Sequence, residues 1–440
     1  MSIHSKYPEA FLNRMQNQLG AEFDAFLQSL DEPSPTSVRL NPFKTANKPL
    51  FEGEEQIPWC ANGKYLKERP SFTFDPLFHA GAYYVQEPSS MFVEQAWKQI
   101  NPSGPVKVLD MCAAPGGKST HLLSLINNNG LLVSNEIIPN RNKILQQNIV
   151  KWGSPNCIVT QNKPEDFEAL PDFFDIILVD APCSGEGLFR KDKEAIDEWS
   201  EKNVELCSVR QRDILKHAIT CLKPGGFLIY STCTFEPGEN DEQISNCGLR
   251  IADFKIPTTV SGISKTKYGY QFHPHKVKGE GFFIALLQKE ESEGEQLSTK
   301  PIPQSKIRNP QFLNNPGNYI EHIKDDLVFA IPQNLLSEFS LLSKNFYIRH
   351  AGIFMGTAKG KDFLPSHDLA LSTELRNDLP SIELNYDDAI MFLRGETPKL
   401  NTTHRGWCLV KFEGLNLGCI KALDGRINNY YPKELRILKR

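Results

Sequence analysis

From about residue 76 to residue 288, short apolar runs alternate with longer stretches of helical spacing. The apolar runs cover residues 106–110, 131–136, 157–161, 175–180, 226–231 and 282–287. Helical spacing is clearest over 139–152 and 203–222. Such alternation is typical of βαβ units, which build a mostly parallel sheet with helices on its faces. The sequence therefore predicts an α/β domain over 76–288.

A chain of 440 residues is too long for one hydrophobic core, so we expect further domains on either side. A lead domain is predicted over 1–75, where helical spacing over 8–30 precedes a strand-like run over 37–41. Residues 289–306 are rich in Glu, Ser, Gln and Pro and predict a linker. The rest, 307–440, predicts an α+β region with helices over 335–342 and 386–393 and strands over 406–412 and 417–422.

Charge and hydropathy exclude several classes of protein. The formal charge of -4 argues against a protein that coats nucleic acid through bulk charge, although it allows a local basic face. No stretch approaches the ~20 apolar residues that span a bilayer, and the N-terminus lacks the apolar centre of a signal peptide, so we expect a cytoplasmic protein. The last twenty residues carry six Lys or Arg, two acids, and Tyr430 and Tyr431; they are either a solvated end or an RNA-contacting patch.

Ten cysteines without a secretory signal predict reduced thiols rather than a disulfide framework. No C-x-x-C pair occurs, and His273 and His275 have no cysteine closer in sequence than Cys247, so no metal site is expected. A free cysteine is most often a small buried apolar side chain. That interpretation accounts for Cys60, Cys157, Cys207, Cys221, Cys247, Cys408 and Cys419.

The apolar run 106–110 ends in an acid and leads through a turn of small residues into a helix over 119–126. The turn consists of Met111, Cys112, Ala113, Ala114, Pro115, Gly116, Gly117 and Lys118. Strand, small-residue turn and helix form the first unit of a Rossmann-type fold, where a ligand approaches the backbone and the N–H donors of the helix N-terminus. The turn is neither G-x-G-x-x-G nor a P-loop. A nucleoside cofactor without a pyrophosphate would suit it, and S-adenosylmethionine is such a molecule.

Glu136 ends the next predicted strand, nineteen residues after Gly117. An acid at that position can accept hydrogen bonds from ribose hydroxyls. A surface-exposed Glu at a strand end is the alternative, and the sequence leaves both interpretations open.

Two cysteines each follow a predicted strand. Asp180-Ala181-Pro182-Cys183 closes the run 175–180, and Ser231-Thr232-Cys233 closes the run 226–231. Ligands of open α/β sheets bind beyond the carboxyl ends of the strands, so we expect both thiols to face one crevice. A role as buried apolar side chains fits them poorly because they lie among turn residues.

Four stretches resemble the motifs of the RNA cytosine-5 methyltransferase family: VLDMCAAPGGKSTHLL, DAPCSGEGLFRKD, YSTCTFEPGEN and KGEGFFIALL. The resemblance covers roughly residues 80–288 and is strongest to bacterial members that act on 16S ribosomal RNA. Residues 383–437 resemble the PUA-like RNA-binding domain of those members. The resemblance implies a Rossmann-like methyltransferase domain with a seven-stranded, mostly parallel sheet, a small N-terminal α/β RNA-binding domain and a C-terminal PUA-like α+β domain over about 380–440.

The resemblance also implies an S-adenosylmethionine-dependent enzyme, expected to be a monomer, that acts on 16S rRNA in the small ribosomal subunit. Transfer RNA is the alternative substrate. Carbon 5 of cytosine is a weak nucleophile, and a thiolate added at carbon 6 makes it enamine-like. After methyl transfer, a base must remove the hydrogen of carbon 5 before the thiolate leaves. In the family the STC cysteine attacks and the DAPC cysteine assists release, which carries over to Cys233 and Cys183.

By the same resemblance Asp180 contacts the cytosine edge and lies near the cofactor, which residues 112–118 and Glu136 hold. Where family members commonly place an Asp after the third strand, this chain has Asn162 and then Lys163; Asn162 could still bond adenine, and Lys163 is the alternative cofactor contact. Arg190 and Lys191 follow the DAPC motif and are either solvated charges or contacts to RNA phosphates.

Three other functions fit less well. Methyltransferases of amino groups carry an (Asp/Asn)-Pro-Pro-(Tyr/Phe) turn, whereas Pro182 is followed here by Cys183. Retention of both Cys183 and Cys233 argues against a non-catalytic RNA-binding assembly factor. An NAD-dependent oxidoreductase is disfavoured because this chain has no G-x-G-x-x-G motif, and that function would leave the two strand-end thiols unexplained.

Overall fold

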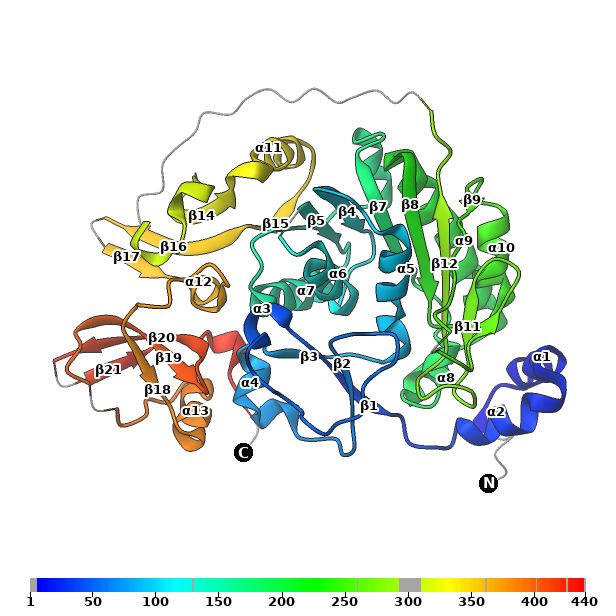
Figure 1. Cartoon of the computed structure of the whole chain (residues 1–440), viewed down its shortest axis with the longest axis horizontal. Helices are drawn as coiled ribbons and strands as arrows, with labels where there is room; N and C mark the ends of the chain where they lie inside the picture. Colours follow the sequence, from blue (N-terminus) through cyan, green and yellow to red (C-terminus); the bar gives the residue numbers. More distant parts are fainter. Residues whose placement is uncertain are drawn as a thin grey trace.

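The computed structural model describes residues 6–128, 130–258, 260–292, 310–360, 362–400, 402–424 and 426–438. Most of the predicted linker, 289–306, lies outside these described residues. A ten-stranded sheet occupies the centre, in the order β10-β11-β12-β8-β7-β4-β5-β6-β15, with β9 paired to β12 (Figure 1). Its strands are β4 (Val106–Asp110), β5 (Gly130–Asn135), β6 (Cys157–Thr160), β7 (Phe174–Asp180), β8 (Leu222–Thr232), β9 (Arg250–Ile251), β10 (Ser264–Lys265), β11 (Tyr270–Phe272), β12 (Phe282–Gln288) and β15 (Ile348–Ala351).

The five strands at the middle of this sheet are parallel, and those at its two edges pair antiparallel. All six strands expected from the apolar runs are present, with ends that differ by a few residues. The expected count of seven strands is too low. Two of the ten, β9 and β10, are only two residues long, and β15 comes from the C-terminal region and was not predicted from the sequence.

Helices cover both faces of the sheet, which explains why its strands are apolar almost throughout. Val108 packs in one core with α5, α6 and α7, while its neighbour Leu109 packs in a second core with α9 and α11. The helices of this domain are α5 (Val93–Ile100), α6 (Gly117–Ile126), α7 (Pro139–Trp152), α8 (Lys193–Glu198), α9 (Glu201–Cys221) and α10 (Asp241–Ser245).

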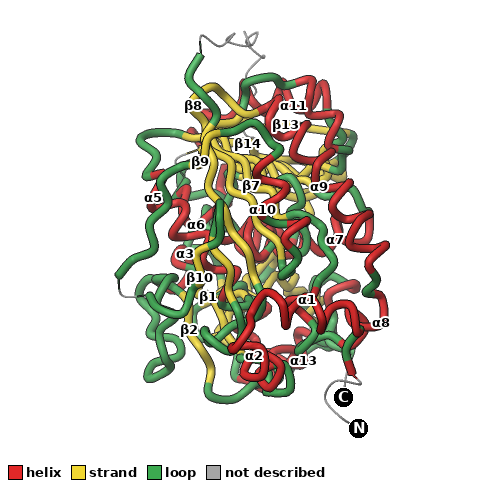
Figure 2. The backbone as a smooth tube through the Cα atoms, turned by 90° about the vertical axis from the view of Figure 1, so that its right-hand side faces the viewer, coloured by secondary structure: helices red, strands yellow, loops and turns green. Residues whose placement is uncertain are grey.

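The N-terminal region has two parts. Helices α1 (Glu9–Leu19) and α2 (Phe23–Ser29) lie beside α8 (Figure 2). A three-stranded sheet follows, in the order β2-β1-β3, with the short helices α3 and α4. Their bounds are β1 (Thr36–Leu40), α3 (Pro42–Thr45), β2 (Gly63–Leu66), α4 (Pro76–His79) and β3 (Tyr83–Val85). Because β3 lies beyond residue 75, this sheet crosses the boundary predicted there; the domain boundaries stay predictions.

The C-terminal region holds two four-stranded sheets. The first has strands that the sequence did not predict: β13 (Tyr319–Lys324), β14 (Leu327–Pro332), β16 (Ile353–Lys359) and β17 (Asp362–Pro365). Its helices are α11 (Leu336–Asn345), which was expected over 335–342, and α12 (His367–Leu371). The second, which contains the expected strands and helix, is built from β18 (Ser381–Glu383), β19 (Gly406–Phe412), β20 (Leu415–Leu423) and β21 (Arg426–Asn429), with α13 (Tyr386–Leu393).

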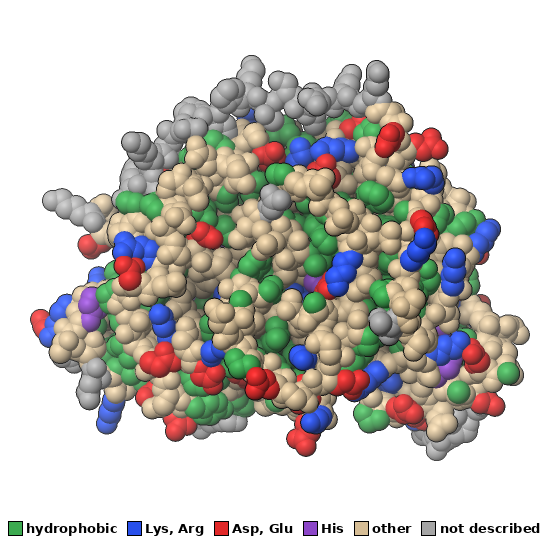
Figure 3. Space-filling view, in the orientation of Figure 1, with side chains coloured by type: hydrophobic (Ala, Val, Ile, Leu, Met, Phe, Trp, Pro, Cys, Tyr) green, Lys and Arg blue, Asp and Glu red, His purple; other side chains and the backbone are tan. Residues whose placement is uncertain are grey.

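Acidic and basic side chains are interspersed over the face shown in Figure 3, in line with the near balance of charge. Within the described residues, no helix combines the length and apolar character needed to cross a membrane. In the basic C-terminal stretch, Tyr431 is 4% exposed and packs on Phe392, so it is a core residue. Tyr430 packs instead against Trp407, which also lies under Lys421, so only this tyrosine remains a candidate for an RNA contact.

Candidate active site

The two strand-end cysteines meet. β7 and β8 are neighbouring parallel strands with Asp180 opposite Ser231, so the loops that follow them leave the sheet at one edge. The Sγ atoms of Cys183 and Cys233 lie 3.2 Å apart, and the backbone N–H of Cys233 donates to the Cys183 sulfur at 3.3 Å. The hydrogen bond to Cys233, together with burial, raises the pKa of Cys183 well above its ordinary value. Cys183 therefore stays a protonated thiol at neutral pH.

Asp180 lies next to this pair and is itself paired. Lys118 Nζ is 2.8 Å from Asp180 Oδ2, and the Ser231 hydroxyl donates to Asp180 Oδ1 at 2.8 Å. Burial lowers the pKa of Lys118, but its attraction to Asp180 outweighs burial and the net shift is upward, with Cys233 adding to it. Lys118 thus puts a positive charge between the cofactor loop and the thiols, a role that the sequence did not suggest.

A cavity opens beside these groups at the carboxyl edge of the sheet. The predicted loop contributes most of its inner wall, and the N-terminal region contributes the opposite wall. Its lining includes Asp110, Cys112, Ala113, Ala114, Pro115, Gly117, Lys118, Asp180 and Lys191 together with Tyr84, Val85, Gln86, Glu87 and Ser90. The last five residues were missed in the sequence because no motif marks them.

Three predicted cofactor residues are not part of this lining: Gly116, Glu136 and Asn162. Gly116 has φ 110°, and a Cβ there would come within 3.2 Å of Leu145 Cδ1, so the turn requires glycine. Glu136 is buried at the end of β5; its Oε1 accepts from the Ile138 N–H at 2.9 Å, and its Oε2 is 3.6 Å from Arg141 Nε. The surface-exposed alternative for Glu136 is therefore wrong, and the ribose contact expected from it stays a prediction.

The structure gives both ends of the Asn162 amide other partners, which disfavours the adenine contact expected from it. Its Oδ1 accepts from the backbone N–H of Tyr347 at 3.0 Å, and its Nδ2 donates to Asp166 at 3.1 Å. Both ends of the amide thus have partners, and its oxygen fastens the residue before β15 to the edge of the sheet. Lys163, the alternative contact, pairs with Glu165 at 3.3 Å.

The two basic residues after the DAPC motif have different environments. Arg190 is buried, and its guanidinium pairs with Glu280 at 3.0 Å and donates to the Gly279 carbonyl at 2.7 Å. It is therefore a structural residue and neither a solvated charge nor a phosphate contact. Lys191 lines the cavity and remains a candidate for an RNA or cofactor contact.

A buried carboxylate supports the loop that carries Cys183. Glu239 Oε2 accepts from the Ser184 N–H at 2.9 Å and from Gln211 Nε2 at 2.8 Å, and burial raises the pKa of Glu239. This residue belongs to the EPGEN end of the STC motif, so its place in the sequence was the available signal.

One group of side chains among the described residues has the composition of a metal site: Cys60, Glu94 and His121. Hydrogen bonds already occupy it, since Glu94 Oε2 is 3.1 Å from His121 Nε2 and Glu94 Oε1 is 2.7 Å from Lys98 Nζ. Burial lowers the pKa of His121 to about 4. Three donors are one short of the four that structural zinc takes, and Lys98 would repel a cation, so we assign no metal here.

Family models of known proteins match the N-terminal, central and C-terminal parts of the chain. The model of the 16S rRNA methyltransferase RsmB/F family matches residues 98–288, that of the N-terminal domain of 16S rRNA methyltransferase RsmF matches 7–88, and that of the methyltransferase RsmF PUA domain matches 379–437. Ribosomal RNA small subunit methyltransferase F of Salmonella arizonae is 31% identical over 99% of this chain and 98% of its own length. The protein of that name from Shewanella loihica is 30% identical over 94% and 91%.

A solved methyltransferase homolog from Pyrococcus horikoshii is 28% identical with a TM-score of 0.55, covering 66% of this chain and 99% of its own. The predicted Rossmann-like fold, with its N-terminal domain and C-terminal PUA domain, is thereby confirmed.

Proposed function

We infer that this chain, which belongs to the ribosomal RNA small subunit methyltransferase F family, is an S-adenosylmethionine-dependent methyltransferase acting on carbon 5 of a cytosine in 16S rRNA. The observation that carries the assignment to carbon 5 is the pair of thiols 3.2 Å apart on the loops that follow β7 and β8. Methyl transfer to an amino group or a hydroxyl oxygen requires no cysteine nucleophile, whereas carbon 5 of cytosine requires covalent activation.

The cavity suits the cofactor on chemical grounds. It has a backbone-lined turn of small residues on one side and the acid Asp110 at its floor. Asp110 Oδ1 is buried and has no hydrogen-bond partner among the described residues, which fits a site completed by a positively charged ligand. Residues 112–118 and Glu136 would hold S-adenosylmethionine, which supplies the methyl group.

We assign Cys233 as the nucleophile. It closes the STC motif, whose cysteine attacks in the family, while the raised pKa of Cys183 keeps that thiol protonated. Its thiolate forms a bond to carbon 6, and the electron pair moves to carbon 5, which accepts the methyl group. Removal of the hydrogen from carbon 5 then breaks the sulfur–carbon bond and releases Cys233 as a thiolate. Cys183, 3.2 Å away, is placed to assist this release.

Asp180 and Lys118 are assigned to the target base. The Asp180 carboxylate can accept a hydrogen bond from the cytosine amino group, and the Lys118 ammonium lies 2.8 Å from its other side. The base must leave its stack to reach the thiols. We place the enzyme in the cytoplasm as a monomer that binds the small subunit or its RNA partly through the PUA domain.

The test is methyl transfer from labelled S-adenosylmethionine to small ribosomal subunits, naked 16S rRNA and transfer RNA in separate reactions. Label recovered as 5-methylcytosine in either ribosomal substrate is expected. Label in transfer RNA alone would contradict the assignment of 16S rRNA as the substrate. No label in any RNA despite cofactor binding would favour a non-catalytic RNA-binding role.

A further inference from the structure

We propose that helices α1 and α2 belong to the active site, and that Arg14 is a positioning residue which fixes the two cysteine loops relative to each other. This inference rests on the proposed function and adds to it a residue of the N-terminal region. The family resemblance in the sequence implied only a role in RNA binding for that region.

Arg14, on α1, bridges equivalent positions of the two loops. Glu186 lies three residues after Cys183, and Glu236 lies three residues after Cys233. Arg14 Nη2 is 2.7 Å from Glu186 Oε2, and Arg14 Nη1 pairs with Glu236. A single guanidinium therefore joins the loop of the proposed nucleophile to the loop of its partner. Its planar fork of donors suits two carboxylates better than a lysine would.

Glu186 is the centre of this arrangement. Its side chain is 0% exposed, so its charge requires a partner, and Arg14 is the cation that pairs with it. Its Oε1 accepts from the indole N–H of Trp199 at 2.8 Å, and its Oε2 accepts from the backbone N–H of Phe235 at 3.2 Å. Glu186 thus reaches from its own loop to the backbone two residues beyond Cys233.

Further contacts draw the two loops together at this point. The backbone N–H of Gly187 donates to the carbonyl of Cys233 at 2.8 Å. A Cβ on Gly187 would lie 2.8 Å from that carbonyl and 2.4 Å from the Gly281 carbonyl, so the approach requires glycine. The separation of the thiols is therefore set by loop-to-loop contacts, to which Arg14 contributes the charged member.

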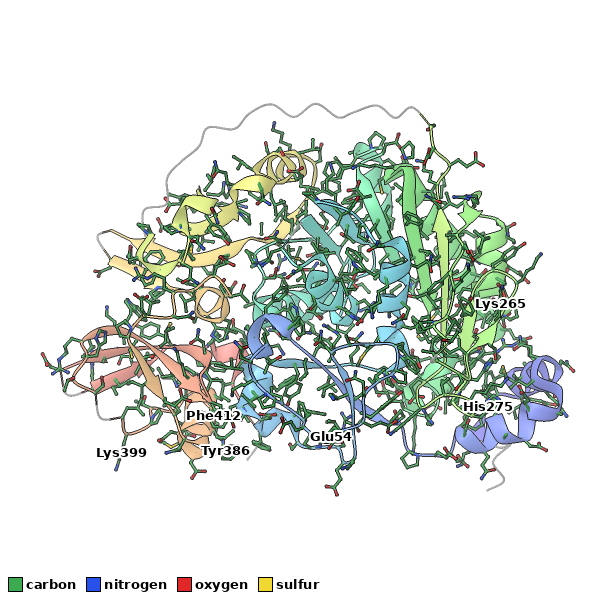
Figure 4. All side chains as sticks on the ribbon, in the orientation of Figure 1. Glu54, Lys265, His275, Tyr386, Lys399 and Phe412 are labelled. Atoms are coloured by element: carbon green, nitrogen blue, oxygen red, sulfur yellow. The ribbon has the colours of Figure 1, made fainter. Side chains whose placement is uncertain are left out.

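The apolar face of the helix pair packs against the same two loops. Phe11 of α1 packs edge-on to Phe189 at 5.0 Å, and Phe26 of α2 packs edge-on to Phe235 at 5.2 Å, measured between ring centroids. Phe189 follows the DAPC loop and Phe235 lies in the STC loop. His275 also contacts Phe26, with ring centroids 5.8 Å apart, and Figure 4 shows it beside the helix pair.

The test compares Arg14→Met with wild type and with Lys6→Met. Lys6 forms an exposed ion pair with Asp31 at 2.7 Å across the same helix pair, so its variant controls for loss of a charge there. We expect Arg14→Met to lower kcat about tenfold or more at saturating RNA, because small displacements of reacting groups cost large factors in rate. The KM for RNA and the affinity for S-adenosylmethionine should stay within about twofold, and Lys6→Met should match wild type.

A second variant separates positioning from folding. Arg14→Met leaves Glu186 buried without its cation, which destabilises the protein. Arg14→Met with Glu186→Gln removes both charges and should recover most of the melting temperature, while kcat stays low. Recovery of kcat together with stability would reduce Arg14 to a purely structural residue.

A third measurement is independent of RNA. Diamide oxidises two neighbouring thiols to a disulfide, taking up two electrons and two protons, and the rate reports how often the sulfurs meet. We expect Arg14→Met to slow formation of the Cys183–Cys233 bond about tenfold relative to Lys6→Met. If Arg14→Met leaves both kcat and the rate of disulfide formation unchanged, the inference is wrong. It is also wrong if the variant raises the KM for RNA while kcat stays unchanged. Absence of methyl transfer by wild type would instead overturn the proposed function.

Discussion

Cofactor binding should depend on pH through Asp110. This carboxyl is 0% exposed, accepts a hydrogen bond from the Ser119 hydroxyl at 2.6 Å and lies on the floor of the cavity. Burial raises its pKa to about 7, the negative charges of Asp180 and Glu136 act in the same direction, and the Ser119 hydrogen bond and Lys118 oppose them. Without a ligand, Asp110 is therefore half protonated near neutral pH.

The direction and size of the effect follow from that pKa. S-adenosylmethionine carries a positive sulfonium, so it binds more tightly when Asp110 is ionised. With a pKa of about 7, roughly a tenth of the molecules have Asp110 ionised at pH 6 and roughly nine-tenths at pH 8. If the ionised form is the one that binds, the affinity rises about tenfold over that range, which corresponds to about 1.4 kcal/mol.

Isothermal titration at pH 6, 7 and 8 measures this directly. Asp110→Asn should bind with an affinity that no longer depends on pH. S-adenosylhomocysteine, which lacks the sulfonium charge, should show a smaller slope with wild type than S-adenosylmethionine does. A flat profile for wild type, or an equal slope for Asp110→Asn, would refute the link between Asp110 and the cofactor charge.

Three further outcomes test the site. Cys233→Ala should abolish methylation with cofactor affinity nearly unchanged, whereas Cys183→Ala should accumulate an RNA–protein adduct that survives denaturing electrophoresis; a freely turning-over Cys183→Ala enzyme would contradict the assignment. Oxidation of wild type with diamide should stop methylation, and a reducing thiol should restore it, because the sulfurs are 3.2 Å apart. Asn162→Ala should leave cofactor affinity within about twofold but lower the unfolding free energy by about 1 kcal/mol in urea titration, since Asn162 fastens β15.

The central part of the site could be predicted from the sequence because its determinants are local. The turn from Cys112 to Lys118 lies between a strand and a helix that are adjacent in the chain, so the motif itself fixes the geometry. Cys183 and Cys233 are distant in sequence, but each ends a strand of one parallel sheet. The rule that such strands present their carboxyl ends at one edge was enough to bring them together.

The sequence is a poor guide where a partner far along the chain decides what a side chain contacts. Asn162 has the right position for an adenine contact, but its amide oxygen accepts a hydrogen bond from the backbone of Tyr347. Tyr347 directly precedes β15, a strand that was not predicted. Arg190 looks like a surface charge in its own segment, yet Glu280, ninety residues later, pairs with it in the interior. Neither interaction has a local pattern, so sequence periodicity cannot reveal it.

The same reasoning bears on what counts as the catalytic unit. When only its own segment is considered, a charged residue next to a motif is expected to be solvated. If the structure buries that residue, its charge must instead have a partner in the protein. Glu186 and Glu236 lie within the two cysteine motifs, and the cation that joins them comes from α1. The motifs therefore locate the chemistry in residues 76–288, while the relative position of the two thiols also depends on a helix outside that range.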